Sequence, residues 1–203
     1  MRALGVLAAR LQGTTAFPVL RDYRMVVRKL TERLQTRVAD GLLESHVEAL
    51  EKICGSLPWD ASEHVGSHND FNPRNVLFDG SRLWLIDWET AYRNDPLVDV
   101  AILADNFAPN PGLQDALLES WLGRAADAVL IQRLSAVRAL TRLYYAGLLM
   151  AFVPSSSPVI TDLSALTQDE FKRRISNGSL QSVAPETRIE LAKMCLAGFL
   201  AIQ

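Results

Sequence analysis

The sequence predicts a mainly α fold of the α+β class, with one small β-hairpin, on three observations. Apolar residues recur at intervals of three and four along most of the chain, which is the spacing of amphipathic helices. Two short β-prone runs, "NVLF" and "LWLID", interrupt that pattern on either side of the turn-forming "DGSR". With 49% hydrophobic residues, the chain is long enough for one sizeable core, so we expect residues 1–203 to form a single domain.

Helices are expected nearly everywhere except in the stretch from His68 to Glu89. The segments "RDYRMVVRKLTERL" (21–34) and "LLESHVEALEKI" (42–53) each place their apolar side chains on one helical face. Asp95 stands in a capping position before Pro96, so a helix is predicted to start there. The Pro/Ser-rich segment "VPSSSPVITDL" is predicted to be a surface loop. Further helices are predicted at 113–122, 126–152 and 185–200.

The hairpin is predicted to pair Asn75–Phe78 with Leu83–Asp87 in antiparallel fashion. This pairing places Asn75 at the entry of the first strand and Asp87 at the exit of the second, so both side chains lie at the open end. Asp70 precedes them in a loop that Pro73 keeps from becoming helical.

Whole-chain properties restrict the partners. A formal net charge of −2 argues against nucleic acid or an anionic membrane as the main partner. The longest apolar run, "LYYAGLLMAFV" (143–153), is too short to span a bilayer, and no signal peptide is evident, so a cytoplasmic protein is expected. Cys54 and Cys195 have no Cys-x-x-Cys spacing, and a buried thiol is expected at each.

The polar residues around the hairpin suggest phosphoryl transfer. Asp and Asn oxygens that converge at one end of a hairpin form a hard-oxygen site, which suits magnesium together with phosphate oxygens and water. A further carboxylate nearby, that of Asp70, is placed to orient a substrate hydroxyl and accept its proton. Positioning and charge neutralisation of this kind are what phosphoryl transfer requires.

These residues also resemble a known family. "HNDFNPRN" fits the His-x-Asp-x-x-x-x-Asn catalytic loop of the aminoglycoside phosphotransferase and choline/ethanolamine kinase superfamily, which is related in fold to the protein kinases. "LIDWE" fits the metal-binding segment that follows, and "RNDPLVDVAILADNF" resembles the helix that supports the loop. Three ordered motifs are a specific signal, and the resemblance is clearest over residues 64–107.

The resemblance implies a role for each matching residue. It makes Asp70 the catalytic base, His68 a prop for the loop, and Asn75 and Asp87 the ligands of Mg²⁺. Glu89 would support the metal through water or an outer contact. For the nucleotide, Leu77 and Ile86 would form part of the floor under the adenine of ATP. Asp99 would hydrogen-bond the backbone of the catalytic loop.

Other interpretations of the same residues are weaker. Loop Asp and Asn are often simple turn formers, although the order of Asp70, Asn75 and Asp87 favours function. His64 and His68 have the spacing of a zinc pair on a helix, but Gly66 breaks that helix and no third ligand is evident. A Ser67, His68, Asp70 triad is disfavoured because residues so close in sequence cannot converge as a relay.

The family's N-terminal nucleotide-binding lobe is expected to be absent, because only 67 residues precede the motif and their pattern is helical, whereas that lobe is rich in β-strands. No Gly-x-Gly occurs, and the upstream lysines, Lys29 and Lys52, fall on amphipathic helices. The chain is therefore interpreted as a C-terminal lobe alone. Three functions stay open: an ATP- and magnesium-dependent small-molecule kinase lobe, a non-catalytic binding or regulatory remnant, and a hydrolase that uses the same carboxylates.

The acceptor is expected to be a small amino-alcohol such as choline or ethanolamine, with an aminoglycoside as the alternative. The "DVAILADNF" continuation and the acidic residue after Trp88 resemble the choline kinase-like proteins. Aromatic rings hold quaternary ammonium groups. The candidates are Trp88, Tyr92, Trp121, Tyr144 and Tyr145. An aminoglycoside pocket needs several carboxylates, and the sequence shows no obvious cluster among Asp162, Asp169, Glu170 and Glu186.

Overall fold

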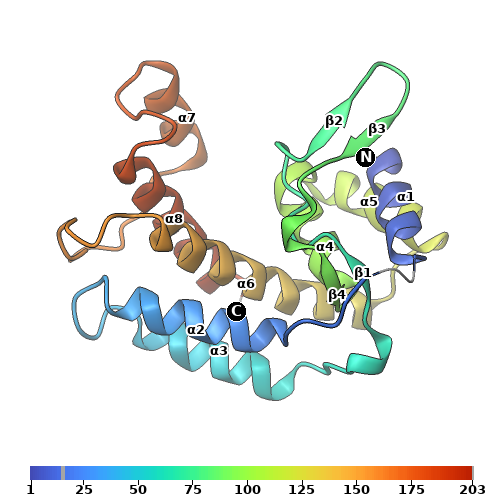
Figure 1. Cartoon of the computed structure of the whole chain (residues 1–203), viewed down its shortest axis with the longest axis horizontal. Coiled ribbons are helices and arrows are strands. Elements are labelled where there is room, and N and C mark those ends of the chain that lie inside the picture. Colours follow the sequence, from blue (N-terminus) through green and yellow to red (C-terminus); the bar gives the residue numbers. More distant parts are fainter. Residues whose placement is uncertain (15–16, 203) are drawn as a thin grey trace. The chain divides into compact units, whose positions relative to one another are not determined.

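A computed structural model describes residues 1–14 and 17–202 and confirms the mainly α fold of the α+β class (Figure 1). The chain divides into two compact units. Unit 1 consists of Met1–Asp22 and Leu57–Arg138, and unit 2 consists of Tyr23–Ser56 and Ala139–Gln203. Every residue predicted for catalysis, metal binding or nucleotide binding belongs to unit 1.

The predicted helices are confirmed, with shifts of one to two residues at most ends. They are α2 (Tyr23–Gln35), α3 (Glu44–Ser56), α4 (Leu97–Phe107), α5 (Pro111–Leu122), α6 (Ala128–Ala151) and α8 (Pro185–Leu200). α4 begins at Leu97 because Pro96 occupies the capping position, and the Asp95 side chain accepts a hydrogen bond from the Leu97 N–H at 2.9 Å. The short helix α7 (Gln168–Ser176) was not predicted.

The expectation that the residues before His68 are helical is confirmed at the start of the chain, where α1 spans Arg2–Gln12. Its buried residues Leu4, Gly5, Ala8 and Leu11 follow the helical spacing of three and four. α1 packs along α5, as Figure 1 shows at the edge of unit 1. Tertiary packing on α5 thus stabilises a segment whose own apolar face is short.

The centre of unit 1 is α4, whose first eight residues, Leu97 to Ala104, are all buried. A helix that is apolar on every side is typical of a core position. Phe71, from the loop before the hairpin, is also fully buried. The loop that carries Asp70 is therefore anchored directly in the core of unit 1.

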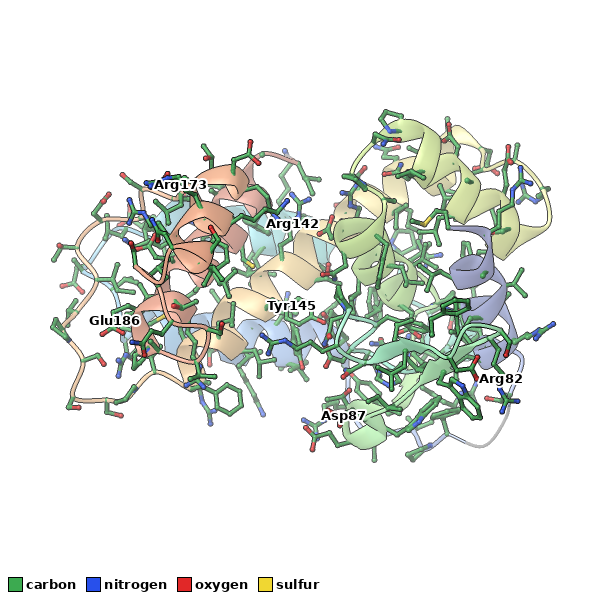
Figure 2. All side chains as sticks on the ribbon, turned by 90° about the horizontal axis from the view of Figure 1, so that it is seen from above. Arg82, Asp87, Arg142, Tyr145, Arg173 and Glu186 are labelled. Atoms are coloured by element: carbon green, nitrogen blue, oxygen red, sulfur yellow. The ribbon has the colours of Figure 1, made fainter. Side chains whose placement is uncertain are left out.

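The predicted hairpin is confirmed as β2 (Val76–Phe78) and β3 (Leu83–Leu85), an antiparallel pair in which Leu77 faces Trp84. The turn depends on Gly80, whose φ of 98° is accessible mainly to glycine. Asp79 Oδ1 accepts hydrogen bonds from the backbone N–H groups of Ser81 and Arg82 at 2.8 and 2.9 Å. Figure 2 shows Arg82 at this closed end and Asp87 beyond the other end of β3.

A second two-stranded sheet was not predicted. It pairs β1 (Val65–Ser67) with β4 (Tyr92–Asn94) in antiparallel fashion. Strands of three residues are too short to show a two-residue period, and these two are separated in sequence by the loop that carries Asp70 and by the hairpin. The sheet brings the entry of the loop next to the start of α4.

Unit 2 consists of α2, α3, α7, α8 and the second part of α6. Its core includes Tyr23, Leu34, Leu50, Leu143 and Phe199, all with exposed fractions of 2% or less. The predicted loop after α6 is confirmed, and Ile160 within it forms an isolated parallel bridge with Val38. Within the described residues, no helix is both long enough and apolar enough to cross a membrane.

The contact between α1 and α5 yields a stability test. A Cβ on Gly5 would lie 2.6 Å from the Leu117 carbonyl oxygen and 2.9 Å from the Trp121 nitrogen, which are backbone atoms that cannot turn away. We expect Gly5→Ala to lower the free energy of unfolding by about 1–3 kcal/mol, because overpacking outweighs the higher helix propensity of alanine. Chemical denaturation followed by circular dichroism measures this change.

The matched control is Gly112→Ala in α5 of the same unit. Its Cβ would meet only Asn110 Oδ1, at an ordinary 3.7 Å. This control should be neutral or stabilising by up to about 1 kcal/mol. Equal effects of the two substitutions would contradict the close α1–α5 approach.

Candidate active site

The carboxylate of Asp70 is held by two asparagine amides in the loop before β2. Asn72 Nδ2 donates to Asp70 Oδ1, and Asn75 Nδ2 donates to Asp70 Oδ2, each at 2.8 Å. Asn75 Nδ2 also lies 3.0 Å from the Asp70 carbonyl oxygen. The two amides fix the orientation of this partly exposed carboxylate.

The backbone before Asp70 is fixed by a buried carboxylate of α4, as the sequence resemblance implied. Asp99 Oδ2 accepts from the His68 N–H at 2.9 Å, and Oδ1 accepts from the Asn69 N–H at 2.8 Å. Complete burial raises the pKa of Asp99 to about 7, although these two hydrogen bonds oppose the rise; the nearby charge of Asp70 adds to it.

His68 is completely buried and ties the loop to the end of β3. Its Nε2–H donates to the Ile86 carbonyl oxygen at 2.9 Å. The imidazole contacts the rings of Phe71 and Trp88, with centroids 5.7 and 4.9 Å away. Burial lowers the pKa of His68, while the bond to Ile86 and the charges of Asp70 and Asp87 oppose that shift. These contacts are those of a packed, neutral histidine.

Asn75 and Asp87 lie at the open end of the hairpin. The Ile86 N–H donates to the Asn75 carbonyl oxygen at 3.0 Å, so Asp87 is the next residue beyond this pair. Asp87 has a φ of 64° and is exposed, while Asn75 is 6% exposed. Glu89, in the short 3-10 helix Trp88–Thr90, is also exposed.

The donor atoms at this end fit magnesium. The Nδ2 of Asn75 donates to Asp70, which leaves its amide oxygen for a metal, and Asp87 offers carboxylate oxygens. Among the described residues, no three His, Cys, Asp or Glu side chains cluster closely enough to form an all-protein metal cage. Mg²⁺ characteristically uses one or two carboxylates and fills its remaining positions with water and phosphate.

The hairpin presents an apolar face. Leu77 and Trp84 are cross-strand partners and therefore point to the same side, where Ile86 follows Trp84 by two residues. The exposed fractions of Leu77, Trp84 and Ile86 are 47%, 44% and 41%. The sequence pointed to Leu77 and Ile86 but not to Trp84, which the register adds to the same surface.

Several polar residues that build the site were missed by sequence reasoning. Asn72 holds Asp70, and Thr90 Oγ1 donates to the His68 carbonyl oxygen at 2.9 Å. Asn69, whose φ is 63°, is buried within hydrogen-bonding distance of Asn94. For Asn69 and Asn72, the available signal was the preference of asparagine for turns and for left-handed backbone. For Thr90 and Asn94, no short-range pattern existed.

The aromatic acceptor candidates divide between the two units. In unit 1, Trp88 is 46% exposed beside His68, Tyr92 is buried, and Trp121 Nε1 donates to Gln12 Oε1 at 2.8 Å. In unit 2, Tyr144 packs on buried Tyr23 with centroids 5.3 Å apart and on Tyr145 at 5.4 Å. Core packing therefore accounts for the contacts of Tyr144.

Two of the acidic residues in unit 2 share a cavity, although the sequence showed no cluster. The cavity has a volume of about 420 Å³, and its lining includes Asp162, Glu186 and Lys193 together with apolar residues such as Ile189. Lys193 Nζ lies 3.5 Å from Glu190 Oε1, an ion pair on α8. Asp162 and Glu186 thus line one cavity, while Asp169 and Glu170 are not part of its lining.

The fold and the loop motifs together point to a phosphotransferase family with a kinase-like fold. Residues 1–139 match the model of the phosphotransferase enzyme family, and the chain belongs to that family. This confirms the resemblance found in the sequence.

Solved structures and a curated relative agree with this assignment. A choline/ethanolamine kinase family protein from Mesorhizobium loti matches over 96% of this chain, with a TM-score of 0.64 and 19% identity. A structure of LicA in complex with AMP matches over 98%, with a TM-score of 0.61 and 16% identity. Protein LicA of Haemophilus influenzae is 41% identical over 54 residues, which is 27% of this chain and 20% of LicA. The chain spans 66% and 61% of the two solved proteins.

The raised pKa of Asp99 gives a pH-dependence test. Between about pH 4 and pH 7 the folded chain keeps a proton on Asp99 that the unfolded chain has released, so the folded state binds more protons. The free energy of unfolding should therefore contain a contribution that falls as pH rises through this window, on the order of a few kcal/mol in total. Urea denaturation across this pH range measures the slope.

Asp99→Asn isolates this contribution, since the histidines with lowered pKa values, such as His68, titrate in both proteins. The variant should be less stable at every pH, and its slope should lack the falling component. Asp115→Asn, the same change on the exposed surface of α5, should keep the wild-type slope. Parallel curves for wild type and Asp99→Asn would refute the titration of Asp99 in this window.

Proposed function

We propose that the chain supplies the catalytic base, the metal ligands and the acceptor side of an ATP- and magnesium-dependent small-molecule kinase. The observation that carries this proposal is the arrangement around Asn75 in a member of the phosphotransferase family. The Asp70 carboxylate binds the Asn75 amide at 2.8 Å, and exposed Asp87 follows the residue hydrogen-bonded to the Asn75 backbone. The proposed base, Asp70, and the proposed metal ligand Asp87 are therefore both tied to the buried residue Asn75.

Asp70 acts as the base in this proposal. Its carboxylate accepts the proton of the acceptor hydroxyl while the hydroxyl oxygen bonds to the γ-phosphorus and the bond to ADP breaks. The amides of Asn72 and Asn75 keep the carboxylate in one orientation. His68 acts as a prop through its bond to the Ile86 carbonyl, and not as a proton carrier, since burial favours its neutral form.

Asn75 and Asp87 would hold Mg²⁺, with Glu89 supporting it through water. The metal would neutralise charge on the phosphate oxygens of the nucleotide. The apolar face of the hairpin, which includes Leu77 and Ile86, would lie under the adenine ring. Nucleotide use is supported by the AMP in the solved LicA structure, whose fold this chain shares.

A further lobe that covers the nucleotide is part of the proposal. Lys29 and Lys52 lie exposed on α2 and α3, which disfavours a phosphate-binding role for either. The chain also spans only about two thirds of the solved kinases that share its fold. We therefore expect full activity only when additional protein completes the nucleotide site.

The acceptor is proposed to be a small amino-alcohol of the choline or ethanolamine type, which the Mesorhizobium loti neighbour supports. An aminoglycoside is the alternative acceptor, which the resemblance to the aminoglycoside phosphotransferase superfamily implies.

Substitution of the two aspartates separates base from metal ligand. In the chain joined to a family N-terminal lobe, Asp70→Asn should lower kcat by about 10²–10⁴-fold and leave Mg²⁺–nucleotide binding largely in place, because it removes a proton acceptor only. Asp87→Asn should instead weaken metal-dependent nucleotide binding. Coupled ADP-release assays and calorimetry measure the two effects.

The control is the 203-residue chain alone, which should show little or no turnover. Robust ATP consumption by this chain that depends on Asp70 would refute the need for a further lobe. Full activity of Asp70→Asn in the joined protein would instead favour a non-catalytic remnant or a different base.

Calorimetric titration with choline, ethanolamine and kanamycin tests the acceptor. We expect choline or ethanolamine to bind and kanamycin to bind more weakly. Glu170→Gln, on α7 of unit 2, is the control and should leave the binding of the preferred amine unchanged. Kanamycin binding in the Asp70 site without binding of the two amino-alcohols would overturn the preference.

A further inference from the structure

Two residues with left-handed backbone flank the candidate site. In the described part of the chain, Asn69 and Asp87 are the non-glycine residues with positive φ, at 63° and 64°. Such backbone is unfavourable for residues with a side chain, and it persists where the surroundings over-determine it. Asn69 directly precedes Asp70, so whatever holds Asn69 also sets the direction of the base.

The side chain of Asn69 is held from several sides while it is only 2% exposed. Its Nδ2 donates to the Thr90 carbonyl oxygen at 2.9 Å and lies 3.4 Å from the Tyr92 carbonyl oxygen and 3.3 Å from that of Ser67. Its Oδ1 accepts from Asn94 Nδ2 at 2.7 Å. Both ends of the amide therefore have partners, which fixes the orientation of the group.

These partners belong to the segment that follows Asp87. Thr90 ends the 3-10 helix that begins after Asp87, and Asn94 lies in β4. Thr90 makes a second link, because its Oγ1 donates to the His68 carbonyl oxygen at 2.9 Å. The loop that carries Asp70 is thus joined by side-chain bonds to the segment that carries Asp87.

We infer that Asn69 is a positioning residue that keeps Asp70 and Asp87 in fixed positions relative to each other. It acts through its amide pair with Asn94 and its bond to the Thr90 carbonyl oxygen. A glycine at position 69 would satisfy the backbone conformation equally well. The asparagine side chain therefore does more than allow the left-handed backbone: it links the loop that carries Asp70 to the segment that follows Asp87. This inference rests on the proposed function, since it assigns Asp87 to the metal.

Electron paramagnetic resonance of Mn²⁺ with ADP tests the inference on the 203-residue chain. Asn69→Gly keeps the backbone conformation and removes the cross-link, so the affinity for Mn²⁺–ADP should fall about 10–100-fold, the usual effect of removing a partner that orients a ligand. Thr90→Val, which removes only the second link, should weaken binding in the same direction and serves if Asn69→Gly does not fold.

A double-mutant cycle shows whether the two amides act as one unit. Asn69→Gly combined with Asn94→Ala should weaken Mn²⁺–ADP binding no more than the stronger single variant. Leu117→Ala, a core change in α5 away from these bonds, controls for loss of stability and should leave the affinity unchanged.

The outcomes separate this inference from the proposed function. Mn²⁺–ADP binding that Asp87→Asn does not weaken would overturn the metal assignment, and the inference with it. Binding that depends on Asp87 but is unchanged in Asn69→Gly and Thr90→Val would overturn the inference alone. An equal loss in Leu117→Ala would also overturn it, because general destabilisation would then account for the effect.

Discussion

The carboxylate of Asp99 accepts the backbone N–H groups of His68 and Asn69, and the geometry of the site depends on this pair of hydrogen bonds. Asp99 lies in the first turn of α4, a helix buried on every side of its first eight residues. The core of unit 1 thereby dictates where the loop enters the site. Breaking this contact would leave two buried donors without partners, at about 1–3 kcal/mol each.

The site has a buried side, whose residues hold the loop in place, and an exposed side that is accessible to ligands. His68, Asn69 and Asn75 are buried and make hydrogen bonds within unit 1. Asp87 and Glu89 are exposed, as is the apolar face that includes Leu77. Preorganised polar groups beside an open surface are what charge stabilisation in phosphoryl transfer requires, since little rearrangement is then needed during reaction.

Local patterns predicted most of the fold. Helical spacing located α2–α6 and α8, and the turn "DGSR" located the hairpin, because these signals arise within a few residues. The helical character of the first residues was predicted, but the bounds of α1 were not, because its apolar face is short and packs mainly on α5. The β1–β4 sheet was missed because its strands have three residues each and pair across the whole loop. Contacts between segments that are distant in sequence produce no periodic pattern in the sequence.

The same distinction applies to the site. Ordered motifs identified Asp70, Asn75, Asp87 and Asp99, and the bonds of Asp99 to the loop backbone are confirmed. The roles of Asp70, Asn75 and Asp87 stay predictions. The most direct test is anomalous diffraction from crystals of the chain with Mn²⁺ and ADP. The account predicts a manganese peak bound by the Asn75 amide oxygen and the Asp87 carboxylate; a peak elsewhere, or none at that position with ADP bound, would contradict it.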